Sequence, residues 1–554
     1  MEIFAKNFTN ENNFTQPFIK LIQQAGEGDT VVFEKKQYHF YKDFSQSKVI
    51  HMTNTDSFRN PKKYFAMLLE NKKNLLLDGN GAEFVIHGDI CSLALLHCEN
   101  ITLKNFTIRY DSPADVELKV KAVNGKKVLF EIPKTTQWKI HGRRITFFDK
   151  SVFSGKNYWQ FDNDKNSHCG VLHSGTNVCR VLHLAAPMSR ILSMKKVTDT
   201  QVEIKYLTKR DFKVGDVYTF SQNKNRNTCG VFVNQCKNIS AENVEVNYLQ
   251  GFGWLSQMCD TVSFRNVTFR PDKEHHVSSF ADLIHVCGCK GSVTVDSCYF
   301  CHPHDDAINI HGAFLRFKKQ IDDYTAVFSF VHKQQGGYTA FYKGDSVKFY
   351  YRSDLQELPG EYVVESAQDD IDAKCCTVRF DKPLPKEITA KFAKQSNVVA
   401  ENITYCPDVE IKDCTFNAIP TRGILCTTSG KVKIHCNTFS DVAMAHIFIS
   451  NDAADWYESG PVRDVDIYEN EFNLQPTKQY EQLNSNGVLI LPITLGKMVT
   501  APVHKNIRIH NNHFIVGRSY PVKAVGVDGI QVYDNVYDGS SKVVFKQCKN
   551  EINK

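Results

Sequence analysis

Several features that mark membrane proteins, nucleic-acid-binding proteins and zinc proteins are missing from this sequence. No apolar run approaches ~18 residues, so no segment is long enough to span a membrane as a helix. The 67 basic residues are nearly balanced by 61 acidic ones, and no Lys/Arg block is long enough for a nucleic-acid-binding stripe. Cys287-Gly288-Cys289 and Cys375-Cys376 lack the paired C-x-x-C spacing of a zinc site. We therefore expect no membrane partner and no nucleic-acid partner, while a homo-oligomer is compatible with the sequence.

A signal peptide is also missing, since Met1 to Asn10 holds no charged segment followed by an apolar run. The chain has 18 cysteines, and six of them sit in or beside a strand-like repeat, where they are interpreted as small buried apolar residues. Mostly reduced thiols favour a cytoplasmic location, or a secreted or periplasmic one if a signal peptide has been removed. The six are Cys98, Cys236, Cys259, Cys298, Cys414 and Cys436.

Nine related segments form the main pattern of the chain. Each alternates apolar and polar residues, with Asn, Asp, Ser or Cys near its middle, and neighbouring copies begin 23 residues apart at three places. Short parallel strands separated by turns at this period are what a right-handed parallel β-helix requires, and Asn at a bend tolerates positive φ. The copies are 100–108, 238–246, 261–269, 292–300, 408–416, 431–439, 464–472, 506–514 and 529–537.

Two regions interrupt the repeat, at 111–228 and 313–400, and their alternating runs predict antiparallel, barrel-like β insertions. Helical periodicity from Phe14 to Ala25, followed by a strand at 30–33, predicts a cap that closes the first coil. The fold class is thus all-β. The expected units are a cap with first coils (1–110), the first insertion (111–228), central coils (229–312), the second insertion (313–400) and the last coils (401–554).

The candidate site is an acidic cluster in the central coils. Asp305 and Asp306 are adjacent, and Asp282 lies 23 and 24 residues upstream, which is one coil. Because rungs of a β-helix stack ~4.8 Å apart, the three carboxylates should lie together. Like charges held close raise proton affinity and provide an acid/base pair at neutral pH. Bend residues with no catalytic role and a metal site of Asp and His ligands are the alternatives.

These motifs resemble glycoside hydrolase family 110, the α-1,3-galactosidases that act on blood-group B type and related α-galactosyl ends. The resemblance spans roughly residues 14–538, and the paired-Asp motif is its most specific part. It implies a metal-independent, inverting hydrolase with three Asp at its centre, no cofactor, and an oligosaccharide that ends in galactose as substrate. The motifs are 281–285, 304–312, 422–425, 449–452 and 456–465.

Further side chains are candidates for binding the sugar. Trp254 and Trp456 could stack on a ring, Asn451 and Glu458 could hold hydroxyl groups, and ordinary packing or loop roles are the alternatives. Arg422 begins a strand near the acids and could bind a hydroxyl or steady a carboxylate. The imidazoles and the amide around the acids complete the set: His285, His304, Asn309 and His311.

The sequence also supports a hypothesis for the mechanism. Asp305 shares its strand parity with Asn309, which places it on the outer face as the acid, while Asp282 and Asp306 hold the water as base. A turn near His304 should widen one gap to the ~6.5–9.5 Å of inverting glycosidases, whereas retaining enzymes hold their acids ~5–5.5 Å apart. Two other classes remain open: a β-helix polysaccharide lyase and a non-catalytic glycan-binding protein.

Overall fold

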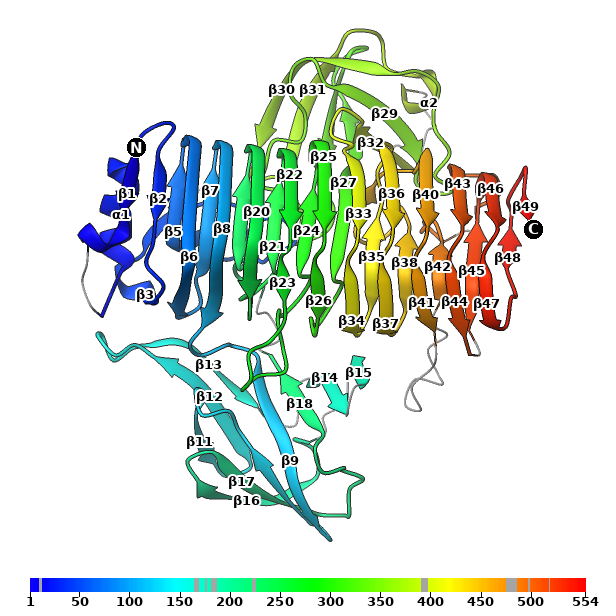
Figure 1. Ribbon diagram of the computed structural model, residues 1–554. Coiled ribbons are helices and arrows are strands. Elements are labelled where there is room, and N and C mark those ends of the chain that lie inside the picture. Colours follow the sequence, from blue (N-terminus) through cyan, green and yellow to red (C-terminus); the bar gives the residue numbers. More distant parts are fainter. Residues whose placement is uncertain are drawn as a thin grey trace.

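The structure is a computed structural model, and it describes residues 1–8, 12–163, 169–174, 177–180, 187–221, 226–389, 397–474, 486–496, 499–517 and 519–554. Its main body is the predicted right-handed parallel β-helix, which runs from the blue N-terminal coil to the red C-terminal coil in Figure 1. The two predicted insertions emerge on opposite sides of this body (Figure 1). Parts of both insertions and of the last coils lie outside the described residues.

Three columns of parallel strands form the wall of the β-helix. The first two columns are joined where strands bend from one to the other, so they count as a single 21-stranded sheet. Its strands are β1 (Glu2–Phe4), β2 (Thr30–Val32), β3 (Gln37–Tyr41), β6 (Lys73–His87), β8 (Glu99–Tyr110), β20 (Lys237–Val246), β22 (Asp260–Arg265), β23 (Thr268–Phe269), β25 (Lys290–Asp296), β26 (Tyr299–Cys301), β33 (Asp408–Lys412), β34 (Thr415–Ile419), β36 (Lys431–His435), β37 (Thr438–Val442), β40 (Asp464–Tyr468), β41 (Glu471–Leu474), β43 (His504–His510), β44 (His513–Val516), β46 (Val527–Tyr533), β47 (Val536–Gly539) and β49 (Ile552–Asn553).

The third column carries the candidate site. Each of its strands pairs in parallel with the strand one coil away, except that β4 is antiparallel to β5. Its strands are β4 (Gln46–Val49), β5 (Lys62–Glu70), β7 (Cys91–Leu96), β19 (Val231–Asn234), β21 (Trp254–Gln257), β24 (Ile284–Cys287), β27 (Ile308–Gln320), β35 (Arg422–Cys426), β38 (Ala445–Ile449), β42 (Asn486–Ile490), β45 (Tyr520–Val525) and β48 (Val544–Lys546).

The 23-residue period is confirmed by the strand register. Ile239 pairs with Val262, and Ile507 pairs with Ile530, each 23 residues further along the chain. Apolar side chains of the repeat point inward and form one core that runs through the tube. The polar residue in the middle of each copy stands at a bend with positive φ, as predicted for Asn. These residues are Asn105, Asn243, Asn266, Ser297, Asp413, Cys436, Glu469, Asn511 and Asp534, with φ between 51° and 60°.

A stack of small polar side chains lies just inside this bend, and we call it the bend ladder: Cys298, Cys414, Asn437, Asn470, Asn512 and Asn535. The amide Nδ2 of Asn470 donates to Oδ1 of Asn512 at 2.9 Å and to the carbonyl of Ile434, also at 2.9 Å. The expectation that Cys436 is buried is wrong, because it occupies the exposed bend position and Asn437 takes the inner one. Cys98, Cys236, Cys259, Cys298 and Cys414 are buried as expected.

The N-terminal cap is confirmed. The 3-10 helix η1 (Ala5–Phe8) precedes helix α1 (Thr15–Gln24), which buries Phe18, Leu21 and Ile22 in the first coil. Strand β2 follows at Thr30, and a second 3-10 helix, η2 (Lys42–Phe44), lies before β4. The apolar face of α1 therefore covers the end of the tube that has no preceding rung.

The first insertion consists of two antiparallel sheets with their own core. The larger sheet has the order β15-β14-β18-β9-β10-β17-β16, and the smaller has the order β11-β12-β13. Their strands are β9 (Val116–Asn124), β10 (Lys127–Glu131), β11 (Gln137–His141), β12 (Arg144–Lys150), β13 (Asn157–Asn163), β14 (Cys169–Ser174), β15 (Asn177–Arg180), β16 (Ile191–Thr198), β17 (Gln201–Tyr206) and β18 (Val217–Phe220).

The second insertion is a closed antiparallel barrel. Its ring of pairings runs β27-β28-β31-β30-β29-β32 and returns to β27. Strand β27 therefore belongs to both the β-helix and the barrel, so the barrel is held rigidly above the third column. The other elements of this insertion are β28 (Thr325–Ser329), β29 (Ser346–Tyr351), β30 (Tyr362–Asp370), β31 (Cys375–Phe380), the short helix α2 (Lys386–Thr389) and β32 (Val398–Asn402). Strand β39 (Glu458–Ser459), from the last coils, pairs with β27 at Gly312 and Ala313.

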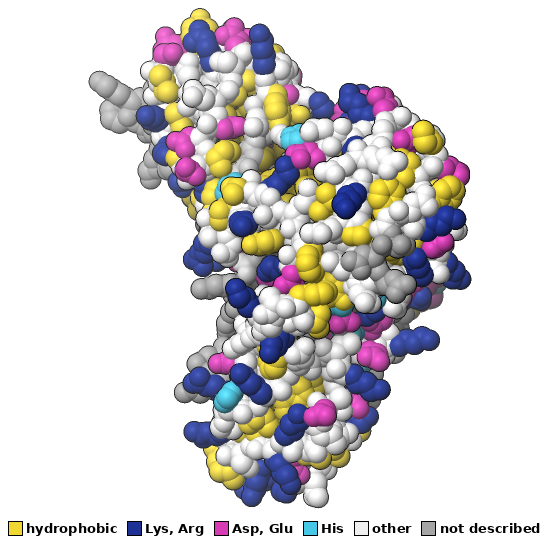
Figure 2. All heavy atoms as spheres, turned by 90° about the vertical axis from the view of Figure 1, so that its left-hand side faces the viewer, with side chains coloured by type: hydrophobic (Ala, Val, Ile, Leu, Met, Phe, Trp, Pro, Cys, Tyr) yellow, Lys and Arg dark blue, Asp and Glu magenta, His cyan; other side chains and the backbone are white. Residues whose placement is uncertain are grey.

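The surface agrees with the nearly balanced charge of the sequence. Figure 2, which looks along the tube from its N-terminal side, shows basic side chains mixed with acidic and uncharged ones over the β-helix and both insertions. Among the described residues, no helix is both long and apolar enough to cross a membrane.

Candidate active site

The predicted acids come together at the N-terminal ends of the central strands of the third column. Ile284 pairs with Ile308, and Ile308 pairs with Ile424. Asp282, Asp306 and Arg422 each stand two residues before one of these positions, so they stack on successive rungs. Phe252 occupies the same place on the rung before, because Trp254 pairs with Ile284. We call Phe252, Asp282, Asp306 and Arg422 the site column.

Gly253 permits this close stacking of rungs. Its φ is +83°, a conformation that favours glycine, and a Cβ at this position would lie 1.9 Å from the carbonyl oxygen of Asp282. The main chain at Gly253 therefore packs directly against the main chain of Asp282 on the next rung. Any larger residue here would push the two rungs apart and displace that carboxylate.

Asp306 is the most firmly held of the three acids. Its Oδ1 accepts from Thr421 Oγ1 at 2.6 Å, from Arg422 Nε at 2.7 Å and from the Arg422 main-chain N–H at 3.2 Å. Its Oδ2 is buried and has no hydrogen-bond partner within the part of the chain that the structure describes. One oxygen thus fixes the carboxylate and the other is left to face a bound molecule.

Asp305 lies beside two guanidinium groups. Arg226 Nη2 donates to its Oδ2 at 3.2 Å, and Arg422 Nη2 is 3.7 Å from its Oδ1. The guanidinium carbon of Arg226 is 5.1 Å from the ring centre of Phe252 and 5.6 Å from that of Trp456. Arg226 is therefore held between two aromatic faces, a geometry that favours a cation.

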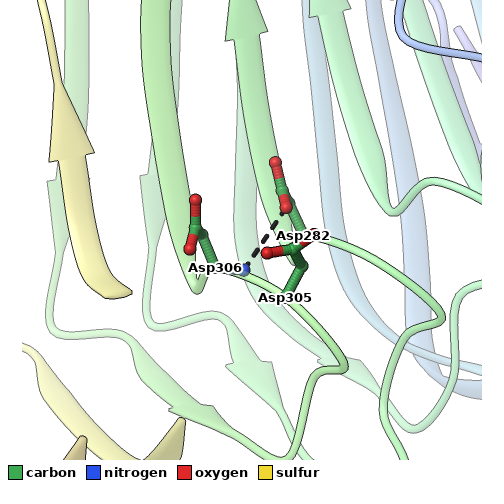
Figure 3. Close-up of side chains that lie close together, drawn as sticks. All are labelled: Asp282, Asp305 and Asp306. Atoms are coloured by element: carbon green, nitrogen blue, oxygen red, sulfur yellow. Dashed lines mark hydrogen bonds between the residues drawn. The ribbon is translucent and has the colours of Figure 1, made fainter. Parts of the chain in front are cut away.

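Asp282 is buried against an imidazole. His285 Nδ1 lies 2.8 Å from its Oδ2, and the main-chain N–H of Asp306 donates to its Oδ1 at 3.3 Å, the bond drawn in Figure 3. Burial raises the pKa of Asp282 to about 7, and the nearby Asp305 carboxylate adds to this shift. Burial likewise raises the pKa of Asp306 to about 7, against the opposing charge of Arg422.

The three acids form the floor of a cavity of about 300 Å³. Figure 3 shows Asp282, Asp305 and Asp306 gathered at the ends of neighbouring strands, and one carboxylate oxygen of each lies within 4.8 Å of the others. Among the predicted binding residues, five line the cavity: His285, Asn309, Arg422, Trp456 and Glu458.

Two of these five contribute unusual polar groups. The Oδ1 atom of Asn309 is buried without a hydrogen-bond partner among the described residues, so it is available to a ligand hydroxyl. Burial raises the pKa of Glu458 to about 8, so this carboxyl group carries a proton at neutral pH. A neutral carboxyl group can both donate and accept, as a sugar hydroxyl does.

The expectation that Trp254 stacks on a sugar is wrong. Its side chain is 1% exposed and packs in the core of the tube against Phe264. Trp254 pairs with Ile284, so it shares the inward direction of that residue, whereas Phe252, two residues earlier, lines the cavity. The register that puts Phe252 one rung before Asp282 could have identified it as the residue that faces the site.

Three other predicted binding residues do not line the cavity. His304 points to the first insertion, where its Nε2 lies 2.8 Å from Thr219 Oγ1. His311 is buried behind His285, with 2.9 Å between their Nε2 atoms. Asn451 is fully buried beyond the end of its strand. A turn near Pro303 directs His304 away from the side on which the acids open.

Four cavity residues were missed by sequence reasoning: Asn54, Arg226, Phe252 and Met444. Arg226 lies at the end of the first insertion, outside any repeat, so no periodic signal marks it. Met444 lies one residue before Ala445, which pairs with Arg422, and register alone could have suggested it. The ring of Trp456 packs on His332 with 4.0 Å between ring centres, which ties the cavity wall to the barrel.

The same three carboxylates are the one group within the described ranges whose oxygens are close enough to hold a metal ion. Arg422 contacts both Asp305 and Asp306, and Arg226 contacts Asp305. Burial opposes the charge of Arg422, but Asp306 and Asp305 outweigh it and raise its pKa. Two fixed guanidinium charges therefore already offset part of the negative charge of these acids.

The spacing of the acids differs from the expectation. No gap between closest oxygens is widened to ~6.5–9.5 Å, since all lie within 4.8 Å of one another. Asp282 and Asp306 stack directly across one rung, and Asp305 turns back toward both. The distance rule therefore does not select a stereochemical outcome here.

Comparison with known proteins gives consistent matches. A family model described as GLAA-B beta-barrel domain II matches residues 325–391, in the barrel region. "Alpha-1,3-galactosidase A" of Bacteroides fragilis is 30% identical over 520 residues, covering 92% of this chain and 82% of that relative. "Alpha-1,3-galactosidase A" of Bacteroides thetaiotaomicron is 29% identical over 545 residues, covering 97% and 90%. "Alpha-1,3-galactosidase B" of the same organism is 29% identical over 533 residues, covering 94% and 82%.

Proposed function

Because the chain belongs to the α-1,3-galactosidases, glycoside hydrolase family 110, we propose that it removes terminal α-1,3-linked galactose from blood-group B type or linear α-galactosyl glycans, with inversion at the anomeric carbon. That it is a glycoside hydrolase follows from its relatives. The linkage, the substrate and the inversion are the proposal. The observation that carries it is the group of three carboxylates, from two adjacent rungs, at the floor of one cavity.

The shape of the site supports an exo-acting enzyme. The cavity of about 300 Å³ is lined around the acids by Arg226, Phe252, Trp456 and Glu458. A cavity of this size has room for one terminal sugar ring, as an exo-acting enzyme requires. Asn309 and Glu458 offer polar groups to its hydroxyls, and the aromatic rings offer apolar faces.

The arrangement suggests a role for each acid. Asp305 is the most exposed of the three, at 8% against 4% for Asp282 and 0% for Asp306, so it lies on the side where the leaving group departs. It donates a proton to the glycosidic oxygen. Asp282 and Asp306 hold the attacking water between them, because a water bonded at about 2.8 Å to each spans oxygens up to about 5.6 Å apart. Asp306 Oδ2 has the free acceptor that this water needs.

A lyase fits this cavity less well. Lyases act on uronates and need a basic side chain, whereas the described cavity lining contains no lysine and both of its arginines are paired with carboxylates. The acidic floor would repel a uronate. A neutral galactoside meets no such repulsion.

A screen of α-galactosyl oligosaccharides tests the proposal. Substrates with terminal α-1,3-, α-1,4- and α-1,6-linked galactose, with and without a fucose branch, are incubated with the enzyme and the released galactose is measured. We expect release from the α-1,3 linkage, lost in D306N. Release from the other linkages but not from α-1,3 would contradict the proposal, as would equal release by D306N.

A further inference from the structure

Two imidazoles stand in line behind Asp282. His285 Nδ1 lies 2.8 Å from Asp282 Oδ2, and His285 Nε2 lies 2.9 Å from His311 Nε2. His311 Nδ1 lies 2.6 Å from the carbonyl oxygen of Gly312. All three side chains are buried, with at most 4% exposed. A continuous chain of hydrogen bonds thus leads from a carboxyl group in the cavity to a main-chain carbonyl behind it.

The carbonyl at the end of this chain determines where the hydrogens sit. A carbonyl oxygen only accepts, so His311 Nδ1 carries a hydrogen. In a neutral His311 the Nε2 atom is then bare, and His285 Nε2 must donate to it. His285 Nδ1 is left without a hydrogen and presents its lone pair to Asp282. A hydrogen bond at that contact requires a proton on Oδ2 of Asp282.

Protons can shift along this chain, but the number of protons that it holds is fixed. Every arrangement that keeps all three hydrogen bonds holds one proton more than a carboxylate with two neutral imidazoles. Burial lowers the pKa of His285 far below its usual value and that of His311 to about 4, while it raises the pKa of Asp282. The extra proton therefore resides on Asp282, and the chain as a whole is uncharged.

Charged and titratable groups face this chain from each element packed against it. The nearest to His311 is Glu458 on β39, with Oε1 3.5 Å from Nε2, and burial keeps that carboxyl group neutral at pH 7. The pKa of Cys287, which pairs with His311 on the next rung, is raised to about 12, so it too is neutral. Within the described residues these groups are Arg226, Cys287, Asp305, Asp306, Arg422 and Glu458.

We propose that His285 and His311 are positioning residues that raise the proton affinity of Asp282 and make it the stronger of the two bases that hold the attacking water. This inference rests on the proposed function. An ionised Asp282 faces a lone pair on His285 instead of an N–H group, so the carboxylate is disfavoured relative to the acid. The carbonyl of Gly312 holds the imidazoles in these tautomers.

The same arrangement accounts for how the site resets. In the free enzyme the proton lies on Asp282, so it first passes to Asp305, and the O–H bond of Asp305 then breaks as this proton passes to the glycosidic oxygen. An O–H bond of water breaks as its proton passes to Asp282, and the remaining hydroxide forms the new bond to the anomeric carbon while the bond from that carbon to the glycosidic oxygen breaks. The turnover ends with the proton on Asp282 and none on Asp305. That is the resting state of the free enzyme. The closest oxygens of Asp282 and Asp305 lie within 4.8 Å, so the proton can pass to Asp305, directly or through one water, for the next turnover.

The tautomers can be observed without any substrate. Protein labelled with ¹⁵N-histidine is studied by long-range ¹H–¹⁵N NMR at neutral pH, and the signals are assigned by their loss in H285Q and H311Q. We expect hydrogen on Nε2 of His285 and on Nδ1 of His311. Hydrogen on Nδ1 of His285 in the wild-type protein would overturn the inference, whether or not the enzyme proves to be a galactosidase.

A pair of variants at His311 tests the effect on catalysis. In H311Q the amide oxygen can still accept from His285 Nε2, whereas H311L offers no acceptor, so His285 is free to donate from Nδ1 and stabilise an ionised Asp282. The alkaline limb of the kcat/KM–pH profile, which reports loss of the last proton from the Asp282–Asp305 pair, should move to lower pH by about one unit or more in H311L and stay in place in H311Q.

The two readouts separate the inference from the proposed function. If the alkaline limb lies at the same pH in wild type, H311Q and H311L, and only the rate is lower in H311L, His311 is merely structural and the inference is overturned. If H311L does not fold, the wild-type tautomers still decide the question. Expected tautomers without any hydrolysis of galactosides would contradict the proposed function and leave the proton chain standing.

Discussion

The bend ladder and the site column are built by the same stacking of rungs, yet their energetics differ. In the bend ladder Asn437, Asn470 and Asn512 each donate to the next Asn, and Asn470 also accepts from Asn437, so both of its polar groups are satisfied inside the wall. In the site column two acids and one arginine stack on successive rungs, and one Asp306 oxygen is left buried without a partner among the described residues.

The difference shows what the β-helix contributes to function. Its register places any residue about 4.8 Å from the equivalent residue one coil away. Identical amides at that spacing satisfy one another, whereas carboxylates at that spacing raise each other's proton affinity. A catalytic group therefore arises where the same position on successive rungs carries side chains that repel one another instead of forming hydrogen bonds. Function at this site is obtained at the expense of local stability.

The largest expected effect is on turnover. Replacing Asp282, Asp305 or Asp306 with Asn should lower kcat by ~10²–10⁴ each, because each variant removes an acid or base from the reaction. Steady-state hydrolysis of an α-1,3-galactoside measures this. D413N is the matched control, since Asp413 stands at an exposed bend with φ 54°, where other coils carry Asn. If two of the three site variants keep near wild-type rates, the active site lies elsewhere.

The next effect is on stability, and it depends on pH. The pKa of Asp282 is about 7 in the folded protein against an ordinary value of 3.8. A raised folded-state pKa stabilises the fold below the ordinary value, and that stabilisation is lost as the pH rises through about 7. D282N cannot ionise, so its free energy of unfolding should exceed that of wild type increasingly between pH 4 and pH 8, by up to about 4 kcal/mol.

Urea unfolding at pH 5 and pH 8 measures this gap in unfolding free energy between D282N and wild type. Asp306 titrates in both proteins, but the charge of Asp282 adds to its raised pKa, so the difference in unfolding free energy reports Asp282 together with its effect on Asp306. A gap that is the same at both pH values would show that burial of Asp282 carries no such cost.

The smallest effect is expected in the bend ladder. N470A removes a buried amide and leaves the groups around it unpaired, which should cost about 1–3 kcal/mol in unfolding free energy while kcat stays unchanged at a temperature where the variant is folded. S440A, on the neighbouring half-buried strand position, should cost at most about 0.5 kcal/mol. An equal cost for the two variants would mean that the ladder does not stabilise the wall.

Sequence periodicity was sufficient for the fold and for the location of the acids. The 23-residue repeat fixed the register, and register placed Asp282 beside Asp305 and Asp306, because a coil returns the chain to the same side. The bend asparagines were predictable because few other residues tolerate positive φ. Trp254 was misassigned because its large ring suggested sugar stacking, although its strand parity places it in the core.

The residues that sequence could not supply come from outside the repeat. Arg226 lies at the end of the first insertion, and the His332 ring against Trp456 comes from the barrel. Their place at the site therefore depends on how the insertions fold back onto the tube. The closing of Asp305 toward Asp282 was also missed, since it depends on a turn between rungs. Such turns are set by tertiary contacts, here the contact between His304 and Thr219.

The central claim is that water, held by stacked aspartates, attacks an α-galactoside directly. Proton NMR of the first-formed sugar, recorded within the first turnovers and before mutarotation, tests it on a substrate with terminal α-1,3-linked galactose. The account predicts β-galactose as the initial product, with the α-anomer appearing only at the rate of mutarotation. Initial release of α-galactose would mean a covalent intermediate and would contradict the account.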